Sequence, residues 1–316
     1  MSTSPGRREV AFISAGLRCG GWHLTATTDS LATDDGRPCV VMAHGFGGTR
    51  DTGLLGFAEG FAAAGFDVLV FDYRGFGDSQ GSPRQHVSHR QQRADYHAAI
   101  AAARRFAGVD PDRIVLWGTS YSGGHVVPVS VTDGRIAATV SMTPALDGVA
   151  ALGAIARRHP VKLLTLVGHG LRDAVHWLLG LPPHLVPIVG LPGSTAMITA
   201  PGAVEGYQAL AGATWRNEVC ARTALEVALN RPTRMAARLR VPTLFQVGEH
   251  DAVAPPSAAR AAAEKAGPYA ELRTYPVDHF DVYDGAWQRQ LLADQVDFLH
   301  RHVAGRVPAA ELRRSS

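Results

Sequence analysis

The sequence predicts an α/β protein with a mainly parallel central sheet flanked by helices. Short apolar runs alternate with longer stretches of helical character, which is typical of chains in which helices connect neighbouring parallel strands. Several of the apolar runs contain no charged residue, as expected for strands that are covered on both faces. The alternation is interrupted between Pro144 and about Arg240, which indicates an inserted segment.

Six strands are expected before the interruption. They cover residues 9–16, 17–26, 39–45, 66–73, 113–118 and 136–142. The first two are expected to form an antiparallel pair joined by a glycine turn. Helices are expected over residues 51–64 and 89–106, and directly after Thr119. Gly65 follows the first of these helices, at the position where a helix commonly ends in a left-handed glycine.

The alternation resumes after the interruption, with strands over residues 241–251 and 271–277 and helices over 257–266 and about 284–302. We therefore expect a core domain with an inserted lid after the sixth strand. The lid is expected to contain a proline-rich apolar part and then a partly helical part. The predicted division assigns residues 9–143 and 241–304 to the core, 144–240 to the lid, and 1–8 and 305–316 to flexible tails.

The composition is that of an ordinary globular protein and excludes several classes. The net charge of +3, with scattered arginines, gives no basic patch of the kind that binds nucleic acid. The three cysteines match no metal or disulfide pattern, and no zinc or dinucleotide motif is present, so we expect no metal and no cofactor. Residues 174–204 contain too many prolines for a membrane span. The absence of an apolar N-terminal segment predicts a cytoplasmic protein; the oligomeric state is not predicted.

The segment GTSYSGG follows the apolar run RIVLWG, and a helix is expected after it. A sharp strand-to-helix turn with small flanking residues exposes a serine and directs helix N–H groups toward an oxyanion. Ser120 is the expected nucleophile, with Gly118 and Ser122 at the two positions that must be small. Ser122 could be the nucleophile in a shifted register, and a glycine-rich turn without chemistry is the remaining alternative.

The segment MAHGFGG follows the strand over residues 39–45. Acyl-transfer chemistry needs a second N–H group for the oxyanion, and the turn after His44 and Gly45 places the N–H of Phe46 there. We expect His44 to hold this loop rather than act as a base, and Phe46 to line the substrate pocket as well. In the next loop, DYRGFGDSQG, Asp72 and Arg74 are expected to pair and fix the chain.

An acid and a base are expected on the loops after the last two strands. The strand VPTLFQVGE leads into Asp251, and a carboxylate at the carboxyl end of a parallel strand faces the ligand crevice. Glu249 is the alternative acid. The last strand is followed by His279, which we expect to take the proton of Ser120 as it attacks an acyl carbon, while Asp251 orients the imidazole. Water then hydrolyses the acyl-enzyme.

The chain resembles the α/β-hydrolase superfamily over about residues 9–302. The resemblance is carried by HGFGG, DYRGFGDSQG, GTSYSGG, GEHD and DHFDVY, and by the chain order serine, acid, histidine. The tyrosine that follows the expected nucleophile resembles the pattern of the branch that contains cocaine-esterase-like and X-prolyl-dipeptidase-like enzymes. The TWRNEV…NRP segment is similar to fungal polyketide acyltransferases. The resemblance implies that Phe46 and Tyr121 supply the oxyanion N–H groups.

The expected function is hydrolysis of a carboxylic ester or thioester with an apolar acyl part, a small-molecule substrate. Apolar pockets with few polar groups bind such ligands, and the lid is expected to supply the lining. The expected lining residues are Trp177, Leu178, Leu179, Leu185, Val186 and Ile188, of which Trp177 and Leu178 are the leading candidates. The alternatives are acyl transfer in natural-product metabolism, peptidase activity, and a non-catalytic binding module on the same fold.

Overall fold

The computed structural model describes residues 6–304 and contains an eight-stranded sheet. The strand order is β1-β2-β4-β3-β5-β6-β9-β10. Strand β2 runs antiparallel to both of its neighbours, β1 and β4. The strands β4, β3, β5, β6, β9 and β10 are parallel to one another. The strands are β1 (Arg7–Ser14), β2 (Leu17–Leu24), β3 (Arg37–Ala43), β4 (Asp67–Phe71), β5 (Val109–Thr119), β6 (Ile136–Met142), β9 (Thr243–Gly248) and β10 (Ala270–Tyr275). The predicted α/β fold with a mainly parallel sheet is confirmed.

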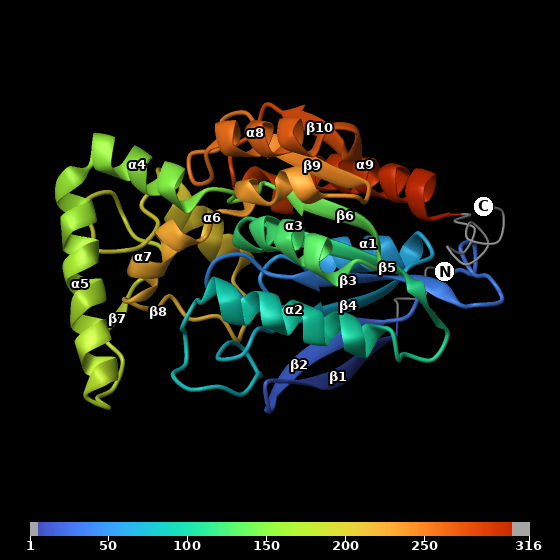
Figure 1. Cartoon of the computed structure of the whole chain (residues 1–316), viewed down its shortest axis with the longest axis horizontal. Coiled ribbons are helices and arrows are strands. Elements are labelled where there is room, and N and C mark those ends of the chain that lie inside the picture. The colour runs from blue at the N-terminus through green and yellow to red at the C-terminus, as the bar shows by residue number, and fades with distance from the viewer. Residues whose placement is uncertain (1–5, 305–316) are drawn as a thin grey trace.

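Helices cover both faces of the sheet (Figure 1). They are α1 (Leu55–Ala63), α2 (His89–Ala103), α3 (Tyr121–Asp133), α8 (Pro256–Ala266) and α9 (Gly285–Val303). Alternate residues of β3 show how the two layers form, since successive side chains of a strand point to opposite faces. Val41 and Ala43 pack into the apolar layer beneath α2 and α3, whereas Val40 and Met42 pack into the layer beneath α1 and α9.

The segment between β6 and β9 lies at one end of the sheet, beyond the carboxyl ends of the parallel strands (Figure 1). Its elements are α4 (Gly148–Arg158), α5 (Pro160–Leu178), β7 (Leu185–Val186), α6 (Ala203–Leu210), β8 (Val219–Cys220), α7 (Thr223–Glu226) and the short 3₁₀ turns η1 (Val227–Leu229), η2 (Pro232–Arg234) and η3 (Ala236–Arg238). Two further 3₁₀ turns, η4 (Gly267–Tyr269) and η5 (Asp281–Tyr283), flank β10.

Several predicted boundaries differ from the structure. The first helix begins at Leu55 rather than at residue 51, because a turn occupies the residues before it. Arg7 and Arg8 belong to β1 and pair with β2, so they are not part of a tail. The remainder of the predicted tails lies outside the described residues, apart from Gly6. Within the described chain, no helix has the length and apolar character needed to cross a membrane.

Candidate active site

Ser120 lies at the sharp turn between β5 and α3. Its backbone adopts φ 55° and ψ −116°, a conformation that non-glycine residues rarely take and that costs about 1–3 kcal/mol. The chain crosses itself closely at this point. A Cβ atom added to Gly118 would lie 2.3 Å from the carbonyl oxygen of Ser122, and one added to Gly124 would lie 2.2 Å from that of Ala145. The glycines of this motif are therefore required by backbone contacts.

Ser122, the alternative nucleophile, is fully buried and fixed in the turn. Its hydroxyl donates to the carbonyl oxygen of Ala43 at 2.7 Å and accepts from the N–H of Thr119 at 2.9 Å. The bond to Ala43 ties the turn to the neighbouring strand β3, and the bond from Thr119 closes the turn onto the end of β5. This geometry gives Ser122 a structural part in the turn and leaves Ser120 as the serine that faces the cavity.

Three side chains from three different loops form a hydrogen-bonded series. The Oγ atom of Ser120 lies 3.0 Å from Nε2 of His279, and Nδ1 of His279 lies 2.7 Å from Oδ2 of Asp251. Their exposed fractions are 8%, 3% and 8%, so the series is largely shielded from solvent. With Nδ1 donating to the carboxylate, Nε2 is free to accept the serine proton.

The Asp251 carboxylate is held in place by backbone groups of its own loop. Its Oδ1 atom accepts from the N–H of Val253 at 2.9 Å and of Ala254 at 2.6 Å, which leaves Oδ2 for the histidine. Glu249, the alternative acid, lies elsewhere. Its side chain is 43% exposed and lies 3.7 Å from the guanidinium of Arg260.

The loop that carries Phe46 passes directly beside the nucleophile. A Cβ atom added to Gly45 would lie 3.0 Å from Cβ of Ser120. His44 Nδ1 donates to the carbonyl oxygen of Gly45 at 3.0 Å, and burial lowers the pKa of His44 to about 4. A neutral, buried imidazole bonded to its own loop agrees with the expected structural role.

Two backbone N–H groups are available next to Ser120. Tyr121 is the first residue of α3, and first-turn N–H groups have no acceptor within their own helix. The N–H of Phe46 makes no hydrogen bond within the described residues. The structure thus leaves both predicted donors free on the two segments that flank the serine hydroxyl.

The predicted pair between Asp72 and Arg74 is not formed. Asp72 instead accepts from the backbone N–H of Arg50 at 2.6 Å and lies 3.5 Å from its guanidinium. Arg74 forms an ion pair with the buried Asp95 of α2. The loop is therefore fixed by partners that are distant in sequence, which neighbouring residues in the motif could not reveal.

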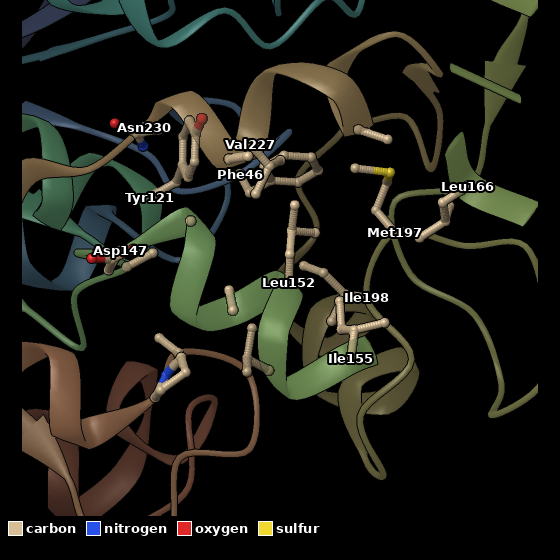
Figure 2. Close-up of a pocket in the computed structure, with 18 of the residues that line it drawn as sticks. Phe46, Tyr121, Asp147, Leu152, Ile155, Leu166, Met197, Ile198, Val227 and Asn230 are labelled. Carbon is tan, nitrogen blue, oxygen red and sulfur yellow. The ribbon is translucent and has the colours of Figure 1, made fainter. Parts of the chain in front are cut away.

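An apolar cavity of about 350 Å³ opens beside Ser120 (Figure 2). Phe46 and Tyr121 line it next to the serine, and most of the remaining wall comes from the segment between β6 and β9. The wall from this segment includes Leu152, Ile155, Leu163, Leu166, Val167, Met197, Ile198, Ala224, Leu225 and Val227. Asp147 and Asn230 are polar residues at the edge nearest Tyr121.

The leading lining candidates from the sequence, Trp177 and Leu178, do not line this cavity. They lie at the C-terminal end of α5 and are 63% and 73% exposed. Val186 and Ile188 are buried in the apolar layer that also contains Phe46, and neither lines the cavity. The wall formed by α4 and the first half of α5 was not predicted, although Leu152 and Ile155, and Leu163 and Leu166, have the three-residue spacing of a helix face.

A second, much smaller space of about 30 Å³ lies next to Ser120 and His279. It is lined by Ser120 and His279 together with Phe46, Tyr207 and Phe280. The hydroxyl of Tyr207 donates to the carbonyl oxygen of Phe46 at 2.6 Å. Tyr207 was not predicted either, because no local motif marks it as a partner of the distant Phe46 loop.

The sheet order, the turn at Ser120 and the loops at the carboxyl edge together define an α/β-hydrolase, an enzyme of the class that acts on ester bonds. The family model described as serine aminopeptidase, S33, matches residues 34–277. The chain belongs to this family of α/β-hydrolases.

Comparisons with individual proteins agree with this assignment. The quorum-quenching protein AidA of Acinetobacter baumannii is 41% identical over 297 residues, which cover 93% of this chain and 95% of that protein. The polyketide transferase grgF of a Penicillium species is 31% identical over 194 residues, covering 61% of this chain and 60% of that one. The crystal structure of GrgF superposes with a TM-score of 0.81 at 25% identity, covering 95% and 99% of the two chains.

Proposed function

We propose that this chain hydrolyses carboxylic esters or thioesters with an apolar acyl part through an acyl-enzyme on Ser120. The observation that carries the proposal is the hydrogen-bonded series of Ser120, His279 and Asp251, whose Ser120 lines an apolar cavity. The strained backbone at Ser120 supports it too, because strain of this kind concentrates at functional sites.

The reaction follows from the hydrogen bonds. Ser120 Oγ attacks the acyl carbon while Nε2 of His279 takes its proton, and the carbonyl oxygen becomes an oxyanion that the N–H groups of Phe46 and Tyr121 bind. The imidazolium then gives its proton to the leaving alcohol or thiol as the tetrahedral intermediate collapses. In the second half, His279 takes a proton from water, the hydroxide attacks the acyl carbon, and Ser120 leaves reprotonated.

The two spaces beside Ser120 favour different parts of the substrate. The large cavity has apolar walls over most of its area and suits the acyl chain. The small space beside His279 measures about 30 Å³, which exceeds the roughly 10–15 Å³ that a cavity needs to hold one water molecule. A space of this size next to the base supports water as the acceptor, and therefore hydrolysis.

The test is labelling with a fluorophosphonate probe together with turnover of nitrophenyl esters of increasing acyl length. Ser120→Ala should abolish both the label and turnover, and Ser122→Ala should keep the label on the remaining Ser120. Turnover should rise with acyl length until the cavity is filled. A folded protein that takes no label would refute the acyl-enzyme and favour a binding module.

The names of the relatives point to substrates that fit this chemistry. The relative with 41% identity is named a quorum-quenching protein. The first candidate for the natural substrate is therefore an acylated lactone, which joins a cyclic ester to an apolar tail. Release of the ring-opened acid, followed by mass spectrometry, would support it. An intact lactone in the presence of an enzyme that cleaves simple esters would exclude this substrate while leaving the esterase proposal in place.

Acyl transfer is the second candidate function, because relatives are named polyketide transferases and thiohydrolases. The acyl-enzyme would be the same, and an alcohol or amine would replace water. Partitioning of one acyl group between water and added alcohols distinguishes the two. Product ratios that follow only the acceptor's concentration relative to water support hydrolysis, whereas saturable preference for one acceptor supports transfer.

The peptidase alternative receives less support from the site. A free peptide amino terminus needs an available carboxylate, and Asp147 is the acidic residue that lines the cavity in the described chain. That carboxylate is already paired with Arg231 at 2.9 Å and accepts from the N–H groups of Val149 and Ala150 at the start of α4. Aminoacyl nitroanilides should therefore be poor substrates compared with the matching nitrophenyl esters.

A further inference from the structure

Helix α5 carries apolar side chains on two separate faces. The inner face contributes Leu163, Leu166 and Val167 to the cavity wall. The outer face is at the edge of the molecule, and Figure 1 shows no described element beyond it. The polar residues Thr165, His169 and Arg172 form a third face. A surface helix normally exposes only such polar residues, so an exposed apolar face of this size indicates a partner.

The outer face follows a regular pattern. Its five large side chains are exposed by 51–74%, and the sixth position is an exposed glycine with open space around its Cβ direction. Successive positions are separated by three and four residues in strict alternation, the spacing of the contact seam of a coiled coil. The seam consists of Val161, Leu164, Gly168, Leu171, Val175 and Leu178.

The seam is also self-complementary. When two copies of the helix are placed antiparallel about a twofold axis between positions 168 and 171, Val161 meets Leu178, Leu164 meets Val175, and Gly168 meets Leu171. A twofold interface requires this reciprocity, in which residue i contacts residue j and j contacts i. Gly168 provides a notch where the partner provides a leucine side chain.

We propose that the outer face of α5 is a dimer interface in which two copies of this chain pack their α5 helices antiparallel. The notch selects the antiparallel direction. In a parallel pair Gly168 would face its own copy and leave a void at the centre of the seam, and such voids reduce stability. In the antiparallel pair each notch receives Leu171 of the partner subunit.

Charge favours a second copy over a lipid surface. Helices that lie on membranes carry several lysines or arginines beside their apolar face. On α5 the exposed cation is Arg172, because Lys162 is half-buried and its ammonium donates to Thr199. The inner face of α5 lines the cavity, so it cannot supply cations either. Apolar contact between two identical seams needs no such charges.

The test uses sedimentation velocity of the full chain at several concentrations, with variants L164K and V175E and the double variant L164K/V175E. Each single change places two charges in the apolar seam and should raise the dimer dissociation constant at least 100-fold. In the double variant the antiparallel register sets each introduced lysine against an introduced glutamate of the partner, so the dimer should return. The matched control I13E changes an exposed side chain of β1 and should stay dimeric.

Three outcomes would overturn the proposal. A wild-type chain that remains monomeric at high concentration would refute it, and binding to lipid vesicles by that monomer would assign the seam to a membrane. Single variants that remain dimeric would place the interface elsewhere. Monomeric single variants without recovery in the double variant would refute the antiparallel register. Circular dichroism checks that each variant is folded, and the result does not depend on the proposed catalytic function.

Discussion

Replacing Asp251 by asparagine tests the proposed orientation of His279. The Oδ1 atom of Asp251 accepts from the N–H groups of Val253 and Ala254, and Oδ2 accepts from Nδ1 of His279 at 2.7 Å. An asparagine would keep its one oxygen on the two N–H groups and turn its amide nitrogen toward the histidine. Since that nitrogen only donates, Nδ1 must accept, and the ring proton moves to Nε2.

The expected cost follows from the position of that proton. Nε2 lies 3.0 Å from Ser120 Oγ and, once protonated, cannot take the serine proton. A histidine held in the wrong tautomer lowers kcat by about 10⁴-fold in serine hydrolases, or about 5.5 kcal/mol at 1.36 kcal/mol per tenfold. The same loss is expected for short and long acyl chains, because the apolar cavity wall is unchanged.

The assay is steady-state hydrolysis of two nitrophenyl esters of different acyl length, with folding checked by thermal unfolding. Glu249→Gln is the matched control, since it makes the same chemical change to a side chain that is 43% exposed. The control should keep its kcat within about twofold, as surface substitutions usually have small effects. A loss of less than tenfold in Asp251→Asn, or a large loss in the control, would refute the reasoning.

Three further predictions concern the surroundings of this site. Ser122→Ala should cost about 1–3 kcal/mol of unfolding free energy, measured by urea denaturation, because two buried hydrogen bonds are lost. Burial lowers the pKa of His44 to about 4, so the unfolded chain protonates first and stability falls from pH 6.5 toward 4. The decrease should reach about 3 kcal/mol, and His44→Gln should flatten it. Ala151→Phe should fill part of the cavity and reduce kcat/KM for long acyl esters at least tenfold more than for short ones.

The parts of the site that local sequence determines could be predicted. Ser120, Asp251 and His279 each follow a strand of the parallel part of the sheet, and parallel strands end at the same edge. Three loops that follow such strands must therefore lie near one another. The structure places the three side chains within hydrogen-bond distance, whereas the pairing of Arg74 with Asp95 needs a helix 21 residues away and could not be read from the motif.

The cavity wall could not be predicted because apolar character does not say which way a side chain points. Along α5, Leu166 is 3% exposed and faces the cavity, whereas Leu164 and Leu178 are 72% and 73% exposed. The same residue type thus occurs on both faces of one helix. The helical period separates the faces, but only the packing of α5 against the core decides which face is inside.

The inserted segment is joined to the Phe46 loop by buried contacts, which argues against treating it as an independent cover. Tyr207 donates to the carbonyl oxygen of Phe46 at 2.6 Å, and a Cβ atom added to Gly47 would lie 2.5 Å from Ile188. Tyr207, Ile188 and Phe46 also share one apolar cluster. Moving the whole segment away would expose these side chains, at about 1.5–3 kcal/mol for a large apolar residue. Access to Ser120 is therefore expected to involve α4 and α5 while α6 remains packed on the Phe46 loop, so that the proposed oxyanion donors keep their positions.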